Sequence, residues 1–465
     1  MKNMIPISKC IHYIVCDRDN GYGIINKYYD EMSRLGISLV ITTDIGISNK
    51  EEIEYGKSLG IETIVTDHHP IINPPDCIYI NPEDYRNYNI TKYCGAGVSY
   101  ILMKELYKEL GLEFDKYKIS LCHAGIATVG DMVPLIDNNY MLVKETLEEF
   151  ENLTYKSKPL KWIINNGLSY VKDRPYVSSD ISFGIAPMIN SLHRMSHPSK
   201  AVEFFLSNDN DFINTLGNYI KENNNLRKQL QKKAIIEALS FLHKNNLKNK
   251  DFIFLDLDVK KTFAGLVASF ITSDYFNKPS IVVSKTDGIY YGSGRSIPNC
   301  SLASLVKNLQ PYCIRCGGHN SAMGLSFTEE NKKNIINEIE KFSLEQKIEG
   351  NLEQEVFIDK ELKIKEINEN LIKEITSLEP YGMNNPTPIF YTKELQISNI
   401  QCINFNTYFT LEEVGDFFNF EDNVSFEAVF FKRDYEGILN CGDIVNIIYE
   451  LTSDGIMLIK NLEIV

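Results

Sequence analysis

Apolar runs and polar helical stretches alternate along the start of the chain. Residues 11–15, 37–44 and 61–69 have the pattern of buried strands. Residues 25–36 and 49–60, which lie between them, have the pattern of helices that end at a glycine. Strands that alternate with helices across short loops predict βαβ units and therefore a parallel sheet.

The pattern changes further along. Residues 95–111 predict another helix, and residues 123–135 form an apolar segment that is broken at Asp131 and that we expect to be a strand. Residues 207–250 are polar and strongly helical, which is typical of a connecting helix. Residues 251–296 return to an α/β pattern, and short β-like runs after about residue 349 predict a small barrel or sandwich.

Metal-binding side chains stand at the ends of the apolar runs. Asp44 closes one predicted strand, Asp67, His68 and His69 close the next, and Asp131 ends the later run. Ligands of open parallel sheets bind beyond the carboxyl ends of the strands, where neighbouring ends lie about 5 Å apart. Carboxylates mixed with imidazole favour Mn²⁺ or Mg²⁺. The alternative interpretation is a set of polar loop residues, with Asp44 as a helix N-cap.

Composition excludes several classes of protein. A length of 465 residues predicts more than one domain, and 43% apolar with 24% charged residues is ordinary for a globular chain. No apolar run of about 18 residues and no apolar leader pattern occur, so we expect a cytoplasmic protein without a membrane span. The ten cysteines show no disulfide framework, and the pair Cys313 and Cys316 has no second pair at a usual zinc spacing.

Negative charge is concentrated in the last quarter of the chain. Residues 346–465 hold 9 Lys and Arg against 22 Asp and Glu, while the first 345 residues are almost neutral. A nucleic-acid binder usually has a basic surface, so any such function must rest on local patches of the first 345 residues. Aromatic side chains for stacking on bases are present in the last quarter, at Tyr408, Phe409, Phe417, Phe418 and Phe420. Only Lys432 and Arg433 are adjacent basic residues in the predicted barrel itself.

Several motifs together resemble one family. TTDIGIS, VTDHHP, CGAGVSY and VGDMVPL, in this order, resemble the DHH phosphoesterases, specifically the RecJ type of single-strand-specific exonuclease. APMINSLHRM, GSGRS, CGGHNSAMG and LEPYGMNNPTPIF continue the resemblance over nearly the whole chain. It implies an α/β protein with a parallel-sheet DHH domain at 1–205, a connecting helix at 206–250, a DHH-associated α/β domain at 251–345 and an OB-like β-barrel at 350–465.

The resemblance also implies roles for the residues at the strand ends. Asp44 is expected to bridge two metal ions, Mn²⁺ or Mg²⁺, and His68 and Asp131 are expected to be ligands of one of them. His69 is expected to face the scissile phosphate, and Asp67 to hold a neighbouring imidazole in the required tautomer. Two cations can activate water and neutralise charge on a phosphate.

Substrate contacts are expected from three motifs. The glycines of CGGHNSAMG leave room for backbone N–H groups to approach a phosphate, and an arginine can hold it with two hydrogen bonds. In NSLHRM, Leu192 and His193 replace residues that are small in the family. The implied substrate-binding residues are Asn190, Arg194, Ser293, Arg295, Gly317, Gly318 and His319.

The front of the sequence departs from the family. A DHH protein is expected to open with a strand followed by Asp-x-Asp, which supplies further metal ligands, and residues 16–24 instead resemble the family's second segment. Asp17 and Asp19 form an Asp-x-Asp that is an alternative source of ligands. A fragment, a mis-started reading frame and one half of a split protein remain open as explanations.

The resemblance implies a metal-dependent 5′–3′ exonuclease that acts on single-stranded DNA in repair and recombination. Two alternatives remain: a phosphodiesterase for short oligonucleotides or cyclic dinucleotides, and a non-catalytic binding or assembly protein. Because the C-terminal quarter is acidic, we expect it to brace the other domains or to bind a protein partner, with little affinity of its own for DNA.

Overall fold

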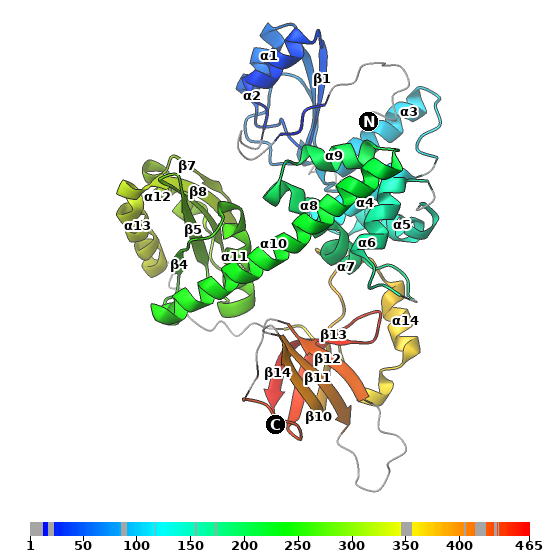
Figure 1. Ribbon diagram of the computed structural model, residues 1–465, viewed down its shortest axis with the longest axis vertical. Helices are drawn as coiled ribbons and strands as arrows, with labels where there is room; N and C mark the ends of the chain where they lie inside the picture. The colour runs from blue at the N-terminus through cyan, green and yellow to red at the C-terminus, as the bar shows by residue number, and fades with distance from the viewer. Residues whose placement is uncertain are drawn as a thin grey trace.

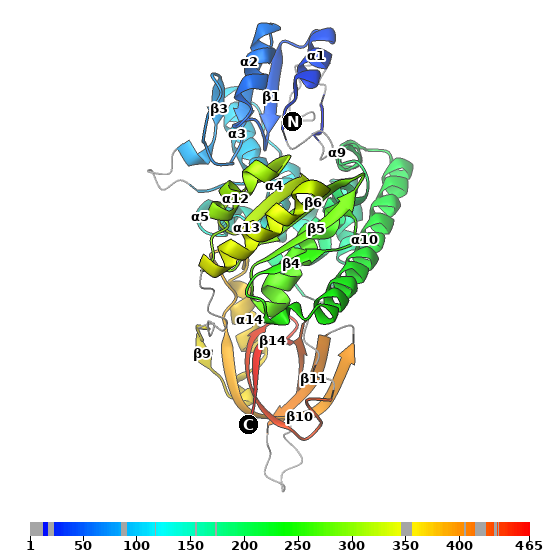
Figure 2. The same cartoon turned by 90° about the vertical axis from the view of Figure 1, so that its left-hand side faces the viewer.

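The computed structural model describes residues 13–16, 23–84, 91–116, 118–153, 156–172, 174–345, 356–403, 406–413, 425–431, 435 and 437–465. Its parts are a small parallel sheet, a group of helices, a second α/β unit and a barrel (Figures 1 and 2). Within these residues no helix is both long and apolar enough to cross a lipid bilayer. The predicted Asp17–Asp19 pair lies outside the described residues.

The strands of the first sheet run parallel to one another, as predicted. The sheet consists of β1 (Leu39–Thr43), β2 (Glu62–Thr66) and β3 (Ile78–Ile80), in that order. One helix precedes each of the first two strands, namely α1 (Asn26–Arg34) and α2 (Lys50–Ser58). Buried side chains of both helices and of β2 share one core. The strand expected over residues 11–15 is wrong in its described part, since residues 13–16 form no strand.

A group of helices comes after the sheet. α4 occupies residues for which we expected a strand, and that expectation is wrong. The helix is buried on nearly every side, so its apolar run lacks the period that separates a helix from a strand. The helices are α3 (Gly95–Glu109), α4 (Ile119–Gly130), α5 (Asp137–Leu153), α6 (Lys158–Gly167), α7 (Ser178–Asp180), which continues through a π-helical turn (Ile181–Ile185) into α8 (Ala186–Met195), and α9 (Ser199–Leu206).

The predicted connecting helix is α10 (Asn210–Lys244), which runs from the helical group to the second α/β unit (Figure 1). Ile213, Leu216 and Ile220 in its first half belong to the core of the helical group. Ala238 and Leu242 near its end belong to the core of the second unit. One helix therefore takes part in two cores and ties them together.

The second α/β unit contains a five-stranded sheet in the order β4-β5-β6-β8-β7. Asp287 and Gly288, both at positive φ, form the tight turn between β5 and β6. The strands are β4 (Ile253–Asp256), β5 (Ser280–Thr286), β6 (Ile289–Arg295), β7 (Arg315–Gly318) and β8 (Ala322–Thr328), with α11 (Ala264–Ser269), α12 (Ala303–Leu309) and α13 (Lys332–Glu345).

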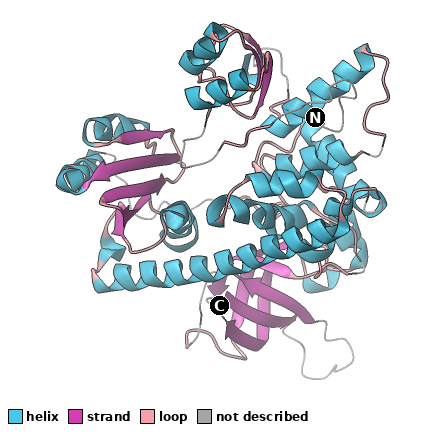
Figure 3. Ribbon diagram, turned by 45° about the horizontal axis from the view of Figure 1, so that its top comes forward, coloured by secondary structure: helices cyan, strands magenta, loops and turns pink. Residues whose placement is uncertain are grey.

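The C-terminal strands form a closed five-stranded barrel, consistent with the predicted OB-like fold. β10 pairs with both β11 and β13, and a register shift beside Glu394, at positive φ, bends it. Figure 3 shows these strands as a group separate from the other two sheets. The elements are β9 (Lys360–Glu361), α14 (Glu369–Ser377), β10 (Phe390–Ile403), β11 (Asn406–Glu413), β12 (Ser425–Phe430), β13 (Ile444–Leu451) and β14 (Met457–Ile464).

The barrel removes one of the candidate stacking aromatics. Phe409 is 1% exposed and belongs to the barrel core, so it offers no face to a base. Tyr408, the preceding residue, points outward and is 39% exposed. The other three phenylalanines and the Lys432–Arg433 pair lie outside the described residues.

Candidate metal centre

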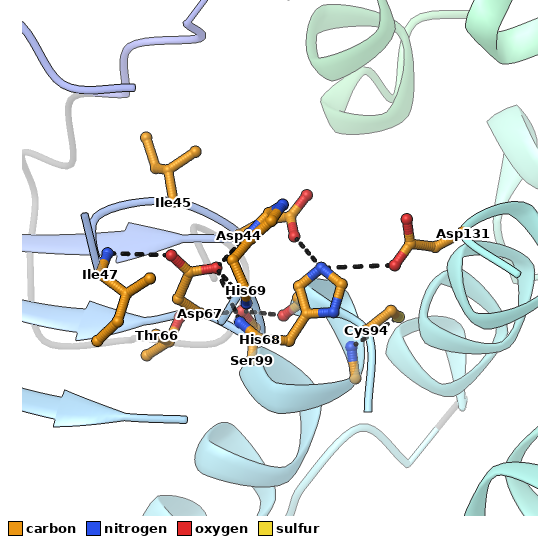
Figure 4. A network of polar contacts seen from close by, with 12 residues as sticks. Asp44, Ile45, Ile47, Thr66, Asp67, His68, His69, Cys94, Ser99 and Asp131 are labelled. Carbon is orange, nitrogen blue, oxygen red and sulfur yellow. Dashed lines mark hydrogen bonds and ion pairs between the residues drawn. The ribbon is translucent and has the colours of Figure 1, made fainter. Parts of the chain in front are cut away.

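The register of two strands brings the first acidic residues together. Thr43 of β1 pairs with Thr66 of β2, so Asp44 and Asp67 leave the sheet at the same level. The backbone N–H of Asp44 donates to the carbonyl of Thr66 at 2.9 Å and continues the ladder by one bond. The predicted meeting of the two strand ends is therefore present (Figure 4).

Two carboxylates converge on His68. Its Nε2 atom lies 3.1 Å from Oδ1 of Asp44 and 3.5 Å from Oδ2 of Asp131. His69 is close as well, since one ligand atom from each of Asp44, His68 and His69 lies within 4.8 Å of the others. The side chains of Asp44 and Asp131 are about half exposed, so the cluster is open to solvent and to a substrate.

Asp131 reaches the cluster from the end of a helix. It is the C-cap of α4, and its backbone N–H donates to the carbonyl of Ala127 at 2.8 Å. The next residue, Met132, adopts a φ of 57°, which is uncommon for a residue other than glycine. This turn ends the helix and directs the chain away while the Asp131 carboxylate stays beside His68.

The Asp44 carboxylate lies against the start of α3. Cys94 caps this helix and Gly95 is its first residue. A Cβ atom on Gly95 would come within 2.6 Å of Cγ of Asp44, so only glycine leaves room for the carboxylate there. Asp44 itself has a φ of 66°, which is again uncommon outside glycine.

Asp67 does not join the cluster directly but orients it. The side chain is buried, and its oxygens accept hydrogen bonds from the N–H of Ile47 at 3.0 Å and of His68 at 2.8 Å. Oδ1 also lies 2.7 Å from Nδ1 of His69. Burial acts to raise the pKa of Asp67, but the hydrogen bonds from His69 and the backbone outweigh it, so the pKa is lowered. Asp67 is thus ionised and keeps the proton of His69 on Nδ1, which leaves Nε2 free to face outward.

The electrostatics of the cluster favour a bound cation. The hydrogen bond to Asp44, with help from the charge of Asp131, raises the pKa of His68 against the effect of burial. Burial, with repulsion from Asp44, raises the pKa of Asp131 although His68 opposes it. The raised pKa of His68 shows that the two carboxylates favour positive charge at its Nε2, which a proton or a metal ion can supply. Two carboxylates and an imidazole suit Mn²⁺ or Mg²⁺, and the donor set therefore fits the expected metal.

Asn190 shares a cavity with this cluster, whereas the head group of Arg194 is directed at the second α/β unit. Asn190 of α8 lines a cavity of about 770 Å³ that is also lined by Asp44 and Asp131. Nη1 of Arg194 donates to the carbonyl of Thr262 at 2.9 Å, so its head group reaches the second α/β unit. The buried Leu192 lies in the core. Leu192 therefore contributes to the packing of the helical group.

The remaining predicted substrate residues lie together on the second sheet, where β6 and β7 both flank β8. Nη1 of Arg295 donates to Oγ of Ser293 at 2.9 Å and to the carbonyl of Gly294 at 2.8 Å. Burial lowers its pKa, and no ion pair among the described residues involves it. None of the hydrogen bonds between described residues joins this group to Asp44, His68 or Asp131.

The two glycines next to His319 differ in what they do. A Cβ atom on Gly317 would meet nothing within 4 Å, which leaves its backbone open to a ligand. A Cβ atom on Gly318 would come within 2.6 Å of Cα of Met323, so this glycine is required by the hairpin itself. His319 is exposed, and its Nδ1 lies 3.3 Å from Oγ of Ser321.

Three residues near the cluster were not predicted. Gly95 carried a signal, because it lies in the CGAGVSY motif beside two other small residues. His123 of α4 lines the cavity, and its buried Nε2 has no hydrogen-bond partner among the described residues. The buried Asn139 donates to the carbonyls of Lys92 at 2.8 Å and of Pro134 at 2.9 Å. Nothing in the local sequence indicated the positions of His123 and Asn139.

Comparison with known proteins covers both ends of this fold. A family model for the DHH family, N-terminal domain, matches residues 2–126, and one for the RecJ OB domain matches residues 358–465. The chain is 26% identical over 411 residues to the single-stranded-DNA-specific exonuclease RecJ of Bacillus subtilis, covering 86% of this chain and 50% of the relative. It is 27% identical to the Escherichia coli protein of the same name, covering 82% of this chain and 69% of the relative. The chain thus spans about half to two thirds of these relatives.

Two solved structures resemble the chain. RecJ from Thermus thermophilus in complex with Mn²⁺ superposes with a TM-score of 0.78 at 22% identity and covers 96% of this chain and 64% of that one. An exonuclease RecJ bound to manganese gives 0.58 at 26% identity and covers 70% of this chain and 80% of that one. The first likeness extends over nearly all of this chain and concerns the fold.

Proposed function

Because the chain belongs to the DHH family and carries a RecJ OB domain, we propose that it is a metal-dependent exonuclease that degrades single-stranded DNA from the 5′ end. The observation that carries the proposal is the convergence of Asp44 and Asp131 on Nε2 of His68. Relatives named as single-stranded-DNA-specific exonucleases support the substrate, and the proposed setting is DNA repair and recombination in the cytoplasm.

Each side chain of the cluster has a proposed task. Asp44, His68 and Asp131 would hold Mn²⁺ or Mg²⁺, with Asp44 as the bridge where two ions bind. A bound ion of this kind supplies positive charge at the phosphate and acidifies a water molecule. His69, oriented by Asp67 through its Nδ1, would face the scissile phosphate with Nε2. The hydrogen bond to Asp67 raises the pKa of His69, which favours the protonated imidazole, and its Nε2–H would donate to the phosphate and stabilise the negative charge.

The residues of the second α/β unit are proposed to bind the strand. Arg295 carries a half-buried charge without a carboxylate partner among the described residues, so a phosphate group would be its natural counter-ion. Gly317 leaves a free approach to the backbone beside His319. Asn190 is proposed to bind the strand beside the metal centre, because it lines the same cavity as Asp44 and Asp131. We retain residues 1–205, 206–250, 251–345 and 350–465 as the proposed domains.

The RecJ OB domain is the feature that favours an exonuclease over a phosphodiesterase for short oligonucleotides or cyclic dinucleotides. Its excess of acidic residues suits a bracing role or a protein partner better than strong binding of DNA. A non-catalytic role would require that the chain bind metal and DNA without cleaving the strand.

The direct test compares substrates and ends. The full chain would be incubated with single-stranded DNA labelled at the 5′ or the 3′ end, with duplex DNA and with a cyclic dinucleotide, in Mn²⁺, Mg²⁺ or EDTA. The proposal predicts early release of the 5′ label from single strands only, abolished by EDTA and by Asp44→Asn. Asp76→Asn, which removes an exposed carboxylate paired with Lys57, should behave as the parent does. Cleavage restricted to the cyclic dinucleotide, or none at all with metal bound, would contradict it.

A further inference from the structure

The loop that begins at Asp131 is held from two sides. We call residues 131–135 the Asp131 loop. From inside its own domain, Nδ2 of the buried Asn139 donates to the carbonyl of Pro134 at 2.9 Å. From outside, the backbone N–H of Leu135 donates to the carbonyl of Met383 at 2.8 Å. Met383 lies more than 200 residues further along the chain, between α14 and β10.

The segment that supplies Met383 is residues 379–383, which we call the clasp. It packs tightly against the Asp131 loop, because a Cβ atom on Gly382 would come within 2.7 Å of Cδ1 of Leu135. Leu135 is 2% exposed, so its side chain has no free direction in which to retreat. Paired backbone bonds between Gly382 and Asn385, at 2.8 and 3.1 Å, fix the turn of the clasp itself.

The clasp also binds the helix that carries Asn190. Oε2 of Glu379 accepts the N–H of Ser178 at 3.2 Å and lies 2.9 Å from the Ser178 hydroxyl. That hydroxyl lies 2.6 Å from the carbonyl of Tyr381. Ser178 is buried and begins α7, which runs through the π-helical turn into α8. The clasp therefore contacts both the Asp131 loop and the start of the helix that carries Asn190.

The backbone of the Asp131 loop explains why such a contact is needed. Met132 is held at a φ of 57°, a conformation that residues other than glycine adopt only when their surroundings impose it. The direction of the Asp131 carboxylate depends on this turn. Hydrogen bonds to α4 fix the backbone N–H groups of Asp131 and Met132, the second at 3.3 Å from the carbonyl of Val129, but they do not reach Leu135 at the far end of the loop. The hydrogen bond to Met383 and the contact with Gly382 fix the far end of the turn.

We propose that the clasp is a positioning element of the metal centre, through which the C-terminal part of the chain sets the place of Asp131. The proposal rests on the proposed function in taking Asp131 as a metal ligand. In this role the C-terminal part of the chain would act at the metal centre without contacting DNA or a protein partner. Residues that orient metal ligands change metal affinity about 10- to 100-fold when they are replaced.

The test measures Mn²⁺ binding by the full chain from the electron paramagnetic resonance of free Mn²⁺. Gly382→Ala places a methyl group against Leu135 and is expected to raise the dissociation constant about tenfold. Ser178→Ala removes the hydrogen bonds of the hydroxyl to the clasp and is expected to raise the dissociation constant by a smaller factor. It provides a second variant if Gly382→Ala does not fold. Fluorescence of the only tryptophan, Trp162, during heating shows whether each variant is folded.

Asp454→Asn is the matched control. Asp454 lies between β13 and β14 and pairs with Nε of Arg174 at 3.0 Å, so it joins the same two parts of the molecule without touching the Asp131 loop. This variant should bind Mn²⁺ as the parent does. Folded Gly382→Ala and Ser178→Ala variants with unchanged Mn²⁺ affinity, or an equal loss in Asp454→Asn, would overturn the positioning role alone. A parent chain that binds no Mn²⁺ would overturn both this inference and the proposed function.

Discussion

The first turn of α3 lies so close to Asp44 that a Cβ atom on Gly95 would come within 2.6 Å of Cγ of the aspartate. The Gly95→Ala variant is therefore expected to displace the carboxylate and to lower Mn²⁺ affinity by about tenfold or more. Helix α3 should persist, since alanine favours a helix more than glycine does. Isothermal titration with Mn²⁺ and the far-ultraviolet circular dichroism of the variant would check both statements.

Gly97→Ala is the control for this prediction, because it makes the same change two residues later in the same helix. The atom nearest to its Cβ would be Cβ of Tyr93, at 3.1 Å. Equal Mn²⁺ affinities of the Gly95→Ala variant and the parent would show that Asp44 is not held where the geometry places it.

The cluster at the strand ends was predictable, because its members are local to the strands. Asp44, His68 and His69 come directly after apolar runs whose pairing as neighbours in a parallel sheet brings the ends together. Asp131 was predicted as a ligand but from a strand and not from the end of α4, since an apolar run that is buried on all sides has no informative period. Its residue type was informative even though its element was not.

Contacts that cross the chain were not predictable. The bond between Leu135 and Met383 joins backbone atoms, so neither side chain signals it. Gly318 and Gly317 look alike in the sequence, yet only the position of Met323 on the next strand makes one of them obligatory. Phe409 was a candidate for stacking on a base, because its residue type alone does not reveal which side of a strand closes onto a core.

The neutral His123 should make the stability of the helical group depend on pH. Burial lowers the pKa of His123 to about 4, below its usual value of 6.5, so the unfolded chain binds a proton that the folded chain does not. The contribution of the neutral His123 to the free energy of unfolding is therefore fully present above about pH 6.5, and it is lost as the pH falls from 6.5 towards 4. Between pH 7.5 and 5.5 the expected loss is about 1 kcal/mol.

Urea unfolding at these two pH values would measure this effect, with Trp162 as the reporter, because its side chain packs on the same core as α4. His123→Leu should reduce the difference between the two pH values. Exposed His243 on α10, changed in the same way, should leave it intact. A pH dependence that survives in His123→Leu would show that other groups cause it.

Arg295 is expected to contribute one phosphate contact. Arg295→Ala should weaken the binding of a single-stranded oligonucleotide and reduce the slope of log affinity against log salt by about 0.7, because each contact releases a counter-ion. Fluorescence anisotropy at several salt concentrations measures this slope. Arg315→Ala, which removes the same charge from an exposed position on β7, is the control for a general change of charge. Equal slopes for the two variants would contradict a specific contact.

The C-terminal region should bind single strands weakly by itself. Residues 346–465 have their own core, formed by the barrel and α14, and carry 22 acidic against 9 basic residues. Expressed alone and shown to fold by circular dichroism, they are expected to bind a single-stranded oligonucleotide more weakly than micromolar near physiological salt, because charge of one sign repels the strand. Micromolar or tighter binding would establish a DNA-binding role for the barrel.

The position of a bound metal tests the central claim most directly. Crystals of the full chain grown with Mn²⁺ and measured by anomalous scattering should show a manganese peak in direct contact with Nε2 of His68 and with carboxylate oxygens of Asp44 and Asp131. Crystals of Asp44→Asn should lack the peak or show it much reduced. A manganese peak elsewhere, with His68 still hydrogen-bonded to Asp44 and no ion between them, would contradict the assignment of this cluster as the metal centre.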